Sequence, residues 1–521
     1  MQPHFRIFIP AAFTFLLSGT LQAEETRKSA KPQTGKPVRY SDFGAKGDGK
    51  TDDMEAIAKA HAYANQHGLK VIADPGRSYY IGGTNNTAVI QTDTDFNTAS
   101  FIIDDTALKN HRASIFTVSS KHRPIPLKGM ASLNKGQTKI DVSLPSNCLV
   151  EVTNSHKKHY IRYGANQNKG ASQTDIFLVD RHGKVDARTP ILWDFKTITQ
   201  AKALPIDLKP LQITGGTFTT LANRAESKYS YHNRGISIRR SNVIVSSIKH
   251  IIQGEGEHGA PYHGFINLSN CADVKVKNSQ FSGHKTYRTI GSAGRPVSMG
   301  SYDLSISKAV NISFIHCRQI NDIHDRSRWG IMASNYCKNL IYDHCELSRF
   351  DAHKGVHNAM ILNSIIGHAG INAIGHGKLI LENTTVVGRQ NLVNLRSDYG
   401  STWDGEFIIR NCKLIPAGSV RSISLITGHY SGQHDFGYTC HMPRKISIDG
   451  LRIEDAKHHK SYPGPALFSN INPRYTSADY IEKFPYIKTK EVTLKNVTTA
   501  SGKPVRVSDN RFMFNQVKVK R

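Results

Sequence analysis

The chain has 521 residues, 38% of them hydrophobic, so it is long enough to bury a large core. Lysine and arginine outnumber aspartate and glutamate by 68 to 41, which gives a formal net charge of +27. This positive charge indicates an anionic partner; the alternative explanation is that it serves only to keep the protein soluble. No apolar run reaches the ~18 residues needed to cross a bilayer, and no signature of a nucleic-acid reader is present, which excludes a membrane span and sequence-specific nucleic-acid binding.

The first 23 residues have the pattern of a secretory signal peptide. Arg6 provides a positive start, residues 7–17 are apolar, and the sequence Leu-Gln-Ala at 21–23 is a suitable cleavage site. Residues 24–37 are rich in Lys, Pro, Ser and Gly, which is typical of a flexible leader. We therefore expect a periplasmic or secreted protein, and we expect a monomer.

Residues 38–81 contain the sequence Phe-Gly-Ala-Lys-Gly-Asp-Gly-Lys-Thr-Asp-Asp and then a helical stretch. Met54, Ile57 and Ala58 share one face of that helix, and Thr51 or Asp52 is a fitting N-cap. This segment resembles the cap that opens pectate-lyase-like β-helices, a superfamily that includes polygalacturonases and many phage tailspikes. The resemblance implies that the helix covers the open end of a β-solenoid, and it says little about the reaction.

An eight-residue pattern of alternating apolar residues recurs through the second half of the chain. Its fifth position, where the alternation breaks, is occupied by Gly215, Ser247, Asn278, His316, His344, Asn363, Asn383, Asn411, Gly450 and Asn496. Alternation with a period of two predicts a half-buried strand, and the shortest spacings, of 19 and 20 residues, leave room for further strands but no helix. The pattern predicts a right-handed parallel β-helix; a β-sandwich would instead show turn signals every 8–12 residues.

The predicted organisation follows from these segments. The signal peptide covers residues 1–23, the leader 24–37, a cap and first coils with insertions 38–205, and the β-helix with its cleft 206–521. Three of the seven cysteines stand at the sixth position of the repeat, where serine and threonine also occur. We therefore expect a stacked column of small residues in place of a disulfide framework.

Polar segments between the repeat strands are expected to form a second face of the solenoid. They are residues 328–331, 353–357, 367–372 and 394–396, one in each of four successive coils, so they should stack ~4.8 Å apart and line one cleft. The predicted substrate-binding residues are Arg328, Arg349, His368, Asn372, Arg389, Asn394 and Trp403.

The spacing of these segments is similar to that of the catalytic strands of polygalacturonases, but the residue types differ. Inverting hydrolysis needs two carboxylates, and only Asp351 lies nearby in the sequence. No CxxC pair indicates zinc, and His353 and His357 would lie ~13 Å apart in an extended chain, too far to bind one ion. Acidic residues are too few to favour calcium, so we expect no cofactor.

Basic residues in the cleft favour β-elimination on a uronate, which requires a neutralised carboxylate, a base and an acid. Lys354 or His353 is the expected base, since neighbouring cations lower the pKa of such groups, Arg396 would hold the carboxylate, and Tyr399 would protonate the leaving oxygen. Trp403 would stack on a sugar ring. The predicted catalytic residues are His353, Lys354, His357, Arg396 and Tyr399.

Residues 349–355 and 396–403 resemble β-helix proteins of glycan-degrading bacteria that include chondroitin-sulfate lyases. The resemblance implies a lyase acting on a sulfated, uronate-containing glycosaminoglycan such as chondroitin or dermatan sulfate. Two alternatives remain: a polygalacturonase-like hydrolase, and a protein that binds polyanionic glycans without cleaving them.

Overall fold

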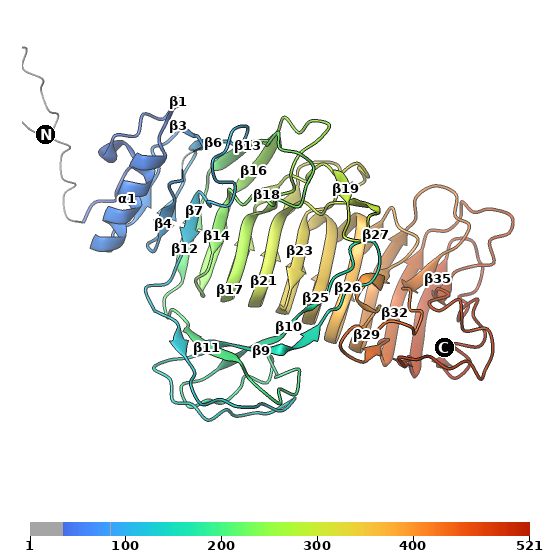
Figure 1. Cartoon of the computed structure of the whole chain (residues 1–521). Coiled ribbons are helices and arrows are strands. Elements are labelled where there is room, and N and C mark those ends of the chain that lie inside the picture. The colour runs from blue at the N-terminus through green and yellow to red at the C-terminus, as the bar shows by residue number, and fades with distance from the viewer. Residues whose placement is uncertain (1–34, 84) are drawn as a thin grey trace, which may run out of the picture.

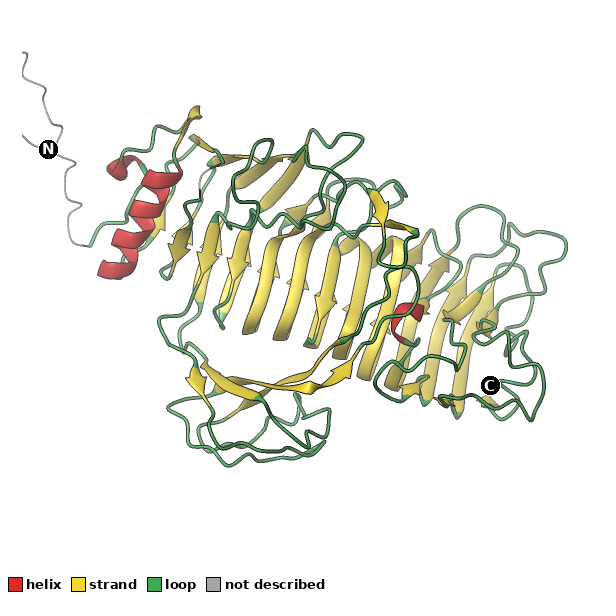
Figure 2. Ribbon diagram, viewed as in Figure 1, coloured by secondary structure: helices red, strands yellow, loops and turns green. Residues whose placement is uncertain are grey.

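The computed structural model describes residues 35–83 and 85–521, which form a parallel β-helix with one α-helix at its amino-terminal end (Figures 1 and 2). The predicted right-handed parallel β-helix with a capping helix is confirmed. The predicted signal peptide and most of the predicted leader lie outside the described residues, and the predicted domain boundaries stay predictions. No helix within the described part of the chain is long and apolar enough to cross a membrane.

Each coil of the solenoid contributes strands to three parallel faces, which we call A, B and C in the order in which the chain visits them. Face A, which carries the sequence repeat, contains β2 (Val71–Ile72), β5 (Thr94–Asp95), β12 (Leu211–Thr214), β15 (Val243–Ser246), β24 (Lys338–Asp343), β36 (Lys518–Lys520) and parts of β17 (His263–Lys277), β21 (Tyr302–Ile315), β25 (Glu346–Leu362), β26 (Ile365–Glu382), β29 (Trp403–Ile415), β32 (Lys445–Ile453) and β35 (Glu491–Thr499).

The long strands continue around the corners into the other two faces. Face B contains β1 (Asp48–Asp52), β3 (Ser78–Ile81), β6 (Ser100–Asp104), β13 (Thr217–Leu221), β16 (Lys249–Gln253), β18 (Gln280–Phe281), β22 (Arg318–Gln319) and β27 (Thr385–Val387). Face C contains β4 (Ala88–Ile90), β7 (Phe116–Val118), β14 (Ile236–Ile238), β23 (Met332–Asn335), β28 (Val393–Leu395), β30 (Ser424–Thr427) and β33 (Ala466–Phe468).

The fifth position of the repeat is the corner between faces A and B. Asn278, Asn363 and Asn383 have φ of 49–50° there, and His316 and His344 have φ of 52°. This left-handed conformation is one that asparagine, histidine and glycine adopt more readily than other residues, which explains the residue types at this position. The centres of the two histidine rings lie 4.7 Å apart, as expected for turn residues of successive coils.

The sixth position points into the solenoid. All seven cysteines are free and buried, and register places Cys317, Cys345 and Ser364 in one column. This column matches the predicted stack of small residues.

The amino-terminal end is covered by α1 (Met54–His67), which buries Met54, Ile57 and Ala60. Of the two predicted N-caps, Asp52 accepts a hydrogen bond from the backbone amide of Met54 (3.1 Å). The N-cap position itself belongs to the next residue, Asp53, whose side chain makes no capping hydrogen bond. Its carboxylate instead accepts hydrogen bonds from the backbone amides of Lys46 (2.6 Å) and Gly47 (3.0 Å), so it ties the preceding loop to the start of the helix.

An insertion leaves the solenoid after β7 of face C and returns at β12 of face A. It forms an antiparallel sheet in the order β10-β9-β11-β8, which appears in cyan beneath the solenoid in Figure 1. Its strands are β8 (Ile125–Pro126), β9 (Cys148–His159), β10 (Ala171–Val179) and β11 (Gln200–Pro205). The insertion has its own apolar core and packs along the corner between faces C and A of later coils, where Leu149 and Ile176 meet Ala272 and Val310.

A buried ion pair fixes the insertion to the solenoid. Lys338 of β24 and Asp175 of β10 are 2.8 Å apart, and their side chains are 1% and 3% exposed. The Lys338 amine also donates to the carbonyl oxygen of Pro190, and the Asp175 carboxylate accepts from the backbone amides of Ile176 (2.8 Å) and Leu192 (2.6 Å). Both charges are therefore compensated within the contact.

A second buried ionic group lies between faces B and C. The Asp303 carboxylate accepts hydrogen bonds from His250 Nδ1 (2.8 Å) and His284 Nε2 (2.7 Å), and all three side chains are nearly inaccessible. Burial alone would lower the pKa of His284, but the charges of Asp303 and Glu255 raise it to about 9. Burial would raise the pKa of Asp303, but the two imidazoles lower it to about 2.

We expect the free energy of unfolding to fall by about 3 kcal/mol as the pH rises from 6.5 to 9, because folded His284 then loses the proton that Asp303 stabilises. Below pH 6.5 the contribution is fully present. Denaturation curves over this pH range should show the fall in the wild type and a flatter profile in His284→Gln. Equal slopes in the two proteins would contradict the assignment.

Candidate functional site

The outer surface of face C carries a row of polar side chains in register. Asp351 pairs with Asn372, Asn372 with Asn394, and Asn394 with Thr427. Asn394 Nδ2 donates to Asn372 Oδ1 (2.9 Å), and Thr427 Oγ1 donates to Asn394 Oδ1 (3.1 Å). His353 and Lys354 were predicted to lie in line with Asn372 and Asn394 on this face. This was wrong, because Asp351 is the residue of their coil that pairs with Asn372.

Asp351 is the centre of an arginine–aspartate cluster. Its carboxylate is inaccessible to solvent and lies 2.9 Å from Arg349 Nη2 and 3.2 Å from Arg396 Nη1. Arg396 Nη2 also contacts Asp398 (3.0 Å), which in turn meets Arg162 Nη2 (3.0 Å). Burial would raise the pKa of Asp398, but Arg396 and Arg162 hold it below its usual value.

Three of the predicted catalytic side chains gather beside this cluster. Tyr399 has its ring centre 5.1 Å from that of His353 and 5.6 Å from the Lys354 amine. Burial and then the guanidinium groups of Arg162 and Arg396 lower the pKa of Lys354, while Asp398 opposes them. The Lys354 amine forms no ion pair with any carboxylate of residues 35–83 or 85–521.

His353 is held as a neutral imidazole with one free nitrogen. Its Nδ1 donates to Asn335 Oδ1 (2.9 Å), which leaves the lone pair on Nε2, and Nε2 is buried without a partner among the described residues. Burial, followed by the charges of Arg396 and Lys354, keeps the pKa of His353 well below its usual value. Burial also raises the pKa of Tyr399 to about 12, so its hydroxyl keeps its proton at neutral pH.

Two predicted site residues lie elsewhere. Trp403 is fully buried, packs on Phe407 and donates its indole N–H to the carbonyl oxygen of Gly377 (2.9 Å), so its prediction as a sugar-stacking residue was wrong. His357 lies on face A, in register with His376, and therefore outside the group formed by Lys354 and its neighbours.

The remaining predicted substrate-binding residues lie toward the corner between faces B and C. Both ring nitrogens of His368 contact backbone carbonyl oxygens, at 2.9 and 3.1 Å, so this histidine holds the loop. Arg328 forms ion pairs with Asp325 (3.1 Å) and Glu255 (3.7 Å).

Arg389 lines an open cavity of about 610 Å³ at the same corner, together with Arg326, which the sequence did not single out. Neither guanidinium has an ion-pair partner in the described part of the chain, and burial followed by the charge of Arg326 lowers the pKa of Arg389. The cavity also reaches Thr427, so it extends the row of polar residues on face C with uncompensated positive charge.

A loop of the insertion, residues 161–170, crosses the outer surface of face C. At one edge the backbone amide of Tyr163 donates to the carbonyl oxygen of Asp398 (3.1 Å), just after β28. At the opposite edge Asn166 Nδ2 donates to the hydroxyl of Tyr229 (2.7 Å), in the loop before β14. No pattern in the sequence indicates this crossing, which brings Arg162 into the cluster.

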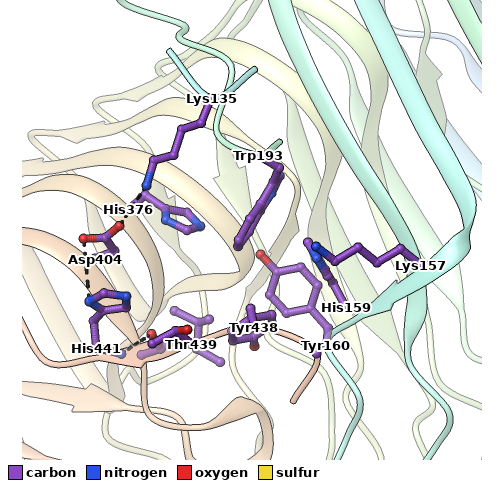
Figure 3. A pocket seen from close by; sticks show the side chains of 13 residues that line it. Lys135, Lys157, His159, Tyr160, Trp193, His376, Asp404, Tyr438, Thr439 and His441 are labelled. Atoms are coloured by element: carbon purple, nitrogen blue, oxygen red, sulfur yellow. Dashed lines mark hydrogen bonds and ion pairs between the residues drawn. The ribbon is translucent and has the colours of Figure 1, made fainter. Parts of the chain in front are cut away.

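A separate pocket of about 330 Å³, which we call the corner pocket, lies between the insertion and the corner from face C to face A (Figure 3). Asp404, one of its lining residues, contacts Lys135 of the insertion (3.3 Å), Arg444 (3.0 Å) and His441 (3.9 Å). The ring of Trp193 lies 5.0 Å from that of His376.

The described residues contain no group of three or more His, Cys, Asp or Glu side chains arranged to hold a metal ion. The carboxylates of the cluster, Asp351 and Asp398, are already engaged by arginines.

Comparisons with known proteins extend the description of the fold. No family model matches the sequence. A stretch of 112 residues, 19% of this chain, is 28% identical to a capsule KL64-specific depolymerase of Klebsiella phage P510, and it spans only 11% of that protein.

Two solved structures are similar over most of the chain. The tailspike protein gp49 of Pseudomonas phage LKA1 matches 88% of this chain and 81% of its own, with a TM-score of 0.53 and 15% identity. The tailspike gp61 of Pseudomonas phage phi297 matches 91% of this chain and 82% of its own, with a TM-score of 0.52 and 12% identity. At these identities the likeness shows a shared β-helix fold.

Proposed function

We propose that the protein is an exported polysaccharide lyase that cleaves a uronate-containing polysaccharide by β-elimination beside Lys354. The observation that carries the proposal is the position of this amine, which lies among the guanidinium groups of the cluster with no carboxylate of its own. Three guanidinium groups, those of Arg162, Arg349 and Arg396, face the two carboxylates Asp351 and Asp398, so positive charge is in excess even when Lys354 is neutral. The excess positive charge suits a substrate that brings a carboxylate to the site.

The chemistry follows from the same side chains. The neutral amine of Lys354 removes the proton at C5 of the uronate, and the electrons of that C–H bond form the C4–C5 double bond as the C4–O bond breaks. The Tyr399 hydroxyl supplies the proton to the leaving oxygen. The arginines stabilise the negative charge that develops on the uronate carboxylate in the transition state.

Hydrolysis by a carboxylate pair fits this geometry poorly. An inverting hydrolase needs one carboxyl group that is protonated when the substrate binds. Asp398 has a lowered pKa, and both Asp398 and Asp351 accept hydrogen bonds from Arg396. The two carboxylates therefore act as anchors for the arginines.

Two sources of substrate are consistent with the proposal. Sulfated glycosaminoglycans such as chondroitin sulfate follow from the resemblance of the segments around Lys354 and Arg396. Bacterial capsular polysaccharides follow from the short match to a capsule depolymerase. Both kinds of polymer can carry uronate. The chain has 68 basic and 41 acidic residues, and this positive balance favours the binding of such polyanions.

We expect the purified protein to release products that absorb ultraviolet light from at least one polymer in a panel of uronate-containing glycosaminoglycans and capsules. Elimination creates a double bond conjugated with the uronate carboxylate, whereas hydrolysis creates reducing ends without that absorbance. The matched control is the same polymer with its carboxylates chemically reduced, which should not be cleaved. New reducing ends on a flat absorbance trace would support a hydrolase, and binding without any product would support a non-catalytic glycan-binding protein.

A further inference from the structure

The corner pocket is separated from Lys354 by a wall of aromatic side chains. Tyr160, Ile374 and Tyr399 pack together with Tyr438, and the ring of Tyr160 meets that of Tyr399 at 5.9 Å and that of Tyr438 at 5.0 Å. Tyr160, Ile374 and Tyr438 also line the corner pocket. Lys354 and the corner pocket therefore lie on opposite sides of one aromatic layer.

The corner pocket contains a buried side chain whose hydrogen bonds are unmade. His159 is 1% exposed, and neither of its ring nitrogens has a partner among the described residues. Burial and then the charge of Lys157 lower the pKa of His159 to about 3, so the ring is neutral and offers one donor and one acceptor. Leaving such a group without partners costs free energy, which indicates that a polar ligand supplies them.

The other walls define the chemistry of that ligand. Trp193 and Tyr160 provide aromatic surface, on which the C–H face of a sugar ring can pack (Figure 3). A second neutral imidazole, His376, also offers a donor and an acceptor, which matches hydroxyl groups better than phosphate oxygens, since those only accept. Lys135 and Lys157 line the pocket against one carboxylate, Asp404, so an anion is favoured.

We propose that the corner pocket is a second glycan-binding site that holds one carboxylated sugar unit, apart from the site of cleavage. This second-site proposal rests on the proposed function only for the identity of the polymer that carries the sugar unit. The pocket volume of about 330 Å³ is at the lower end of the ~300–1,000 Å³ range of small-molecule sites, which suits one sugar unit and not a long segment of chain.

The test is saturation-transfer NMR and calorimetry on the full chain with sodium glucuronate and galacturonate, and with methyl glucoside as the neutral sugar. Lys157 is exposed on β9, so Lys157→Glu should leave the fold intact and weaken uronate binding by about tenfold through charge reversal. The matched control is Lys158→Glu on the same strand, whose amine contacts Ser172 Oγ and does not line the pocket. It should bind as the wild type does.

Three further measurements complete the experiment. Lys354→Ala should bind uronate normally even if it cleaves nothing, which separates this site from the proposed site of cleavage. Trp193→Ala, checked for an unchanged melting temperature, should lose binding. An oligosaccharide of the cleaved polymer should compete with free uronate in Lys354→Ala, as expected for a site that holds part of the polymer.

Equal binding of methyl glucoside and the uronates would overturn the proposal, as would an equal effect of the two lysine replacements. Uronate binding that no oligosaccharide displaces would overturn the assignment to a polymer and indicate a site for the free sugar acid. Loss of uronate binding in Lys354→Ala would place the only uronate site at the cluster.

Discussion

Replacing Lys354 with alanine is expected to lower turnover by a factor on the order of 10²–10⁴, the range lost when a general base is removed. The amine lies beside Tyr399 and among guanidinium groups that lower its pKa. The initial rate of ultraviolet absorbance increase measures the loss. The wild-type rate should rise with pH as the amine loses its proton, with a midpoint below the ordinary lysine pKa.

His353→Ala and Tyr399→Phe are expected to slow turnover as well, while the melting temperature stays close to that of the wild type. Arg318→Ala is the control, because Arg318 is exposed on face B and pairs only with Glu346 (3.2 Å) among the described residues. Full activity of both Lys354→Ala and His353→Ala would show that the base lies on another coil. Arg396→Ala is a poor test, since it would also leave the buried Asp351 carboxylate with one ion pair fewer.

Replacing Lys338 with alanine is expected to destabilise the protein by about 3–5 kcal/mol, because it leaves the Asp175 carboxylate buried and without its counter-charge. The damage should concentrate where the insertion meets the solenoid. Chemical denaturation measures the loss of stability, and limited proteolysis should show faster cleavage within residues 119–209.

Two controls make this prediction specific. Lys378→Ala removes an exposed lysine from face A two coils further on and should change stability little. The double variant Lys338→Met with Asp175→Leu replaces both charges by apolar groups and should recover most of the lost stability. If the double variant is as unstable as Lys338→Ala, packing around the pair is the main contribution and the ionic explanation is wrong.

The fold could be predicted from the sequence because its determinants are local. Apolar residues at alternate positions specify strands, and Asn363 or His344 at the corner adopts the left-handed backbone that turns the chain from face A to face B. The same eight-residue pattern carries this information each time it recurs along the chain. The parallel stacking then follows, because each coil can bury its apolar side chains only against the next one.

The group around Lys354 could be predicted in part for the same reason. Lys354 and Tyr399 follow strands of face C in nearby coils, so their spacing along the chain implies proximity. The register within a coil could not be predicted, because β25 continues through three faces with irregular pairing between them. That irregularity places Asp351 in the polar row and shifts His353 and Lys354 toward the corner.

What the sequence determined by itself is therefore the solenoid, its cap and the coils that carry the basic residues. Only the tertiary structure decided where the insertion packs, and with it the position of Arg162, the aromatic wall at Tyr160 and the corner pocket around His159. These contacts join residues that are far apart in the sequence, and Arg162 and Asp398 are separated by more than 200 positions. Strand periodicity and turn conformation act over a few residues, whereas the docking of an insertion depends on the packing and charge of two distant surfaces, which no local pattern encodes.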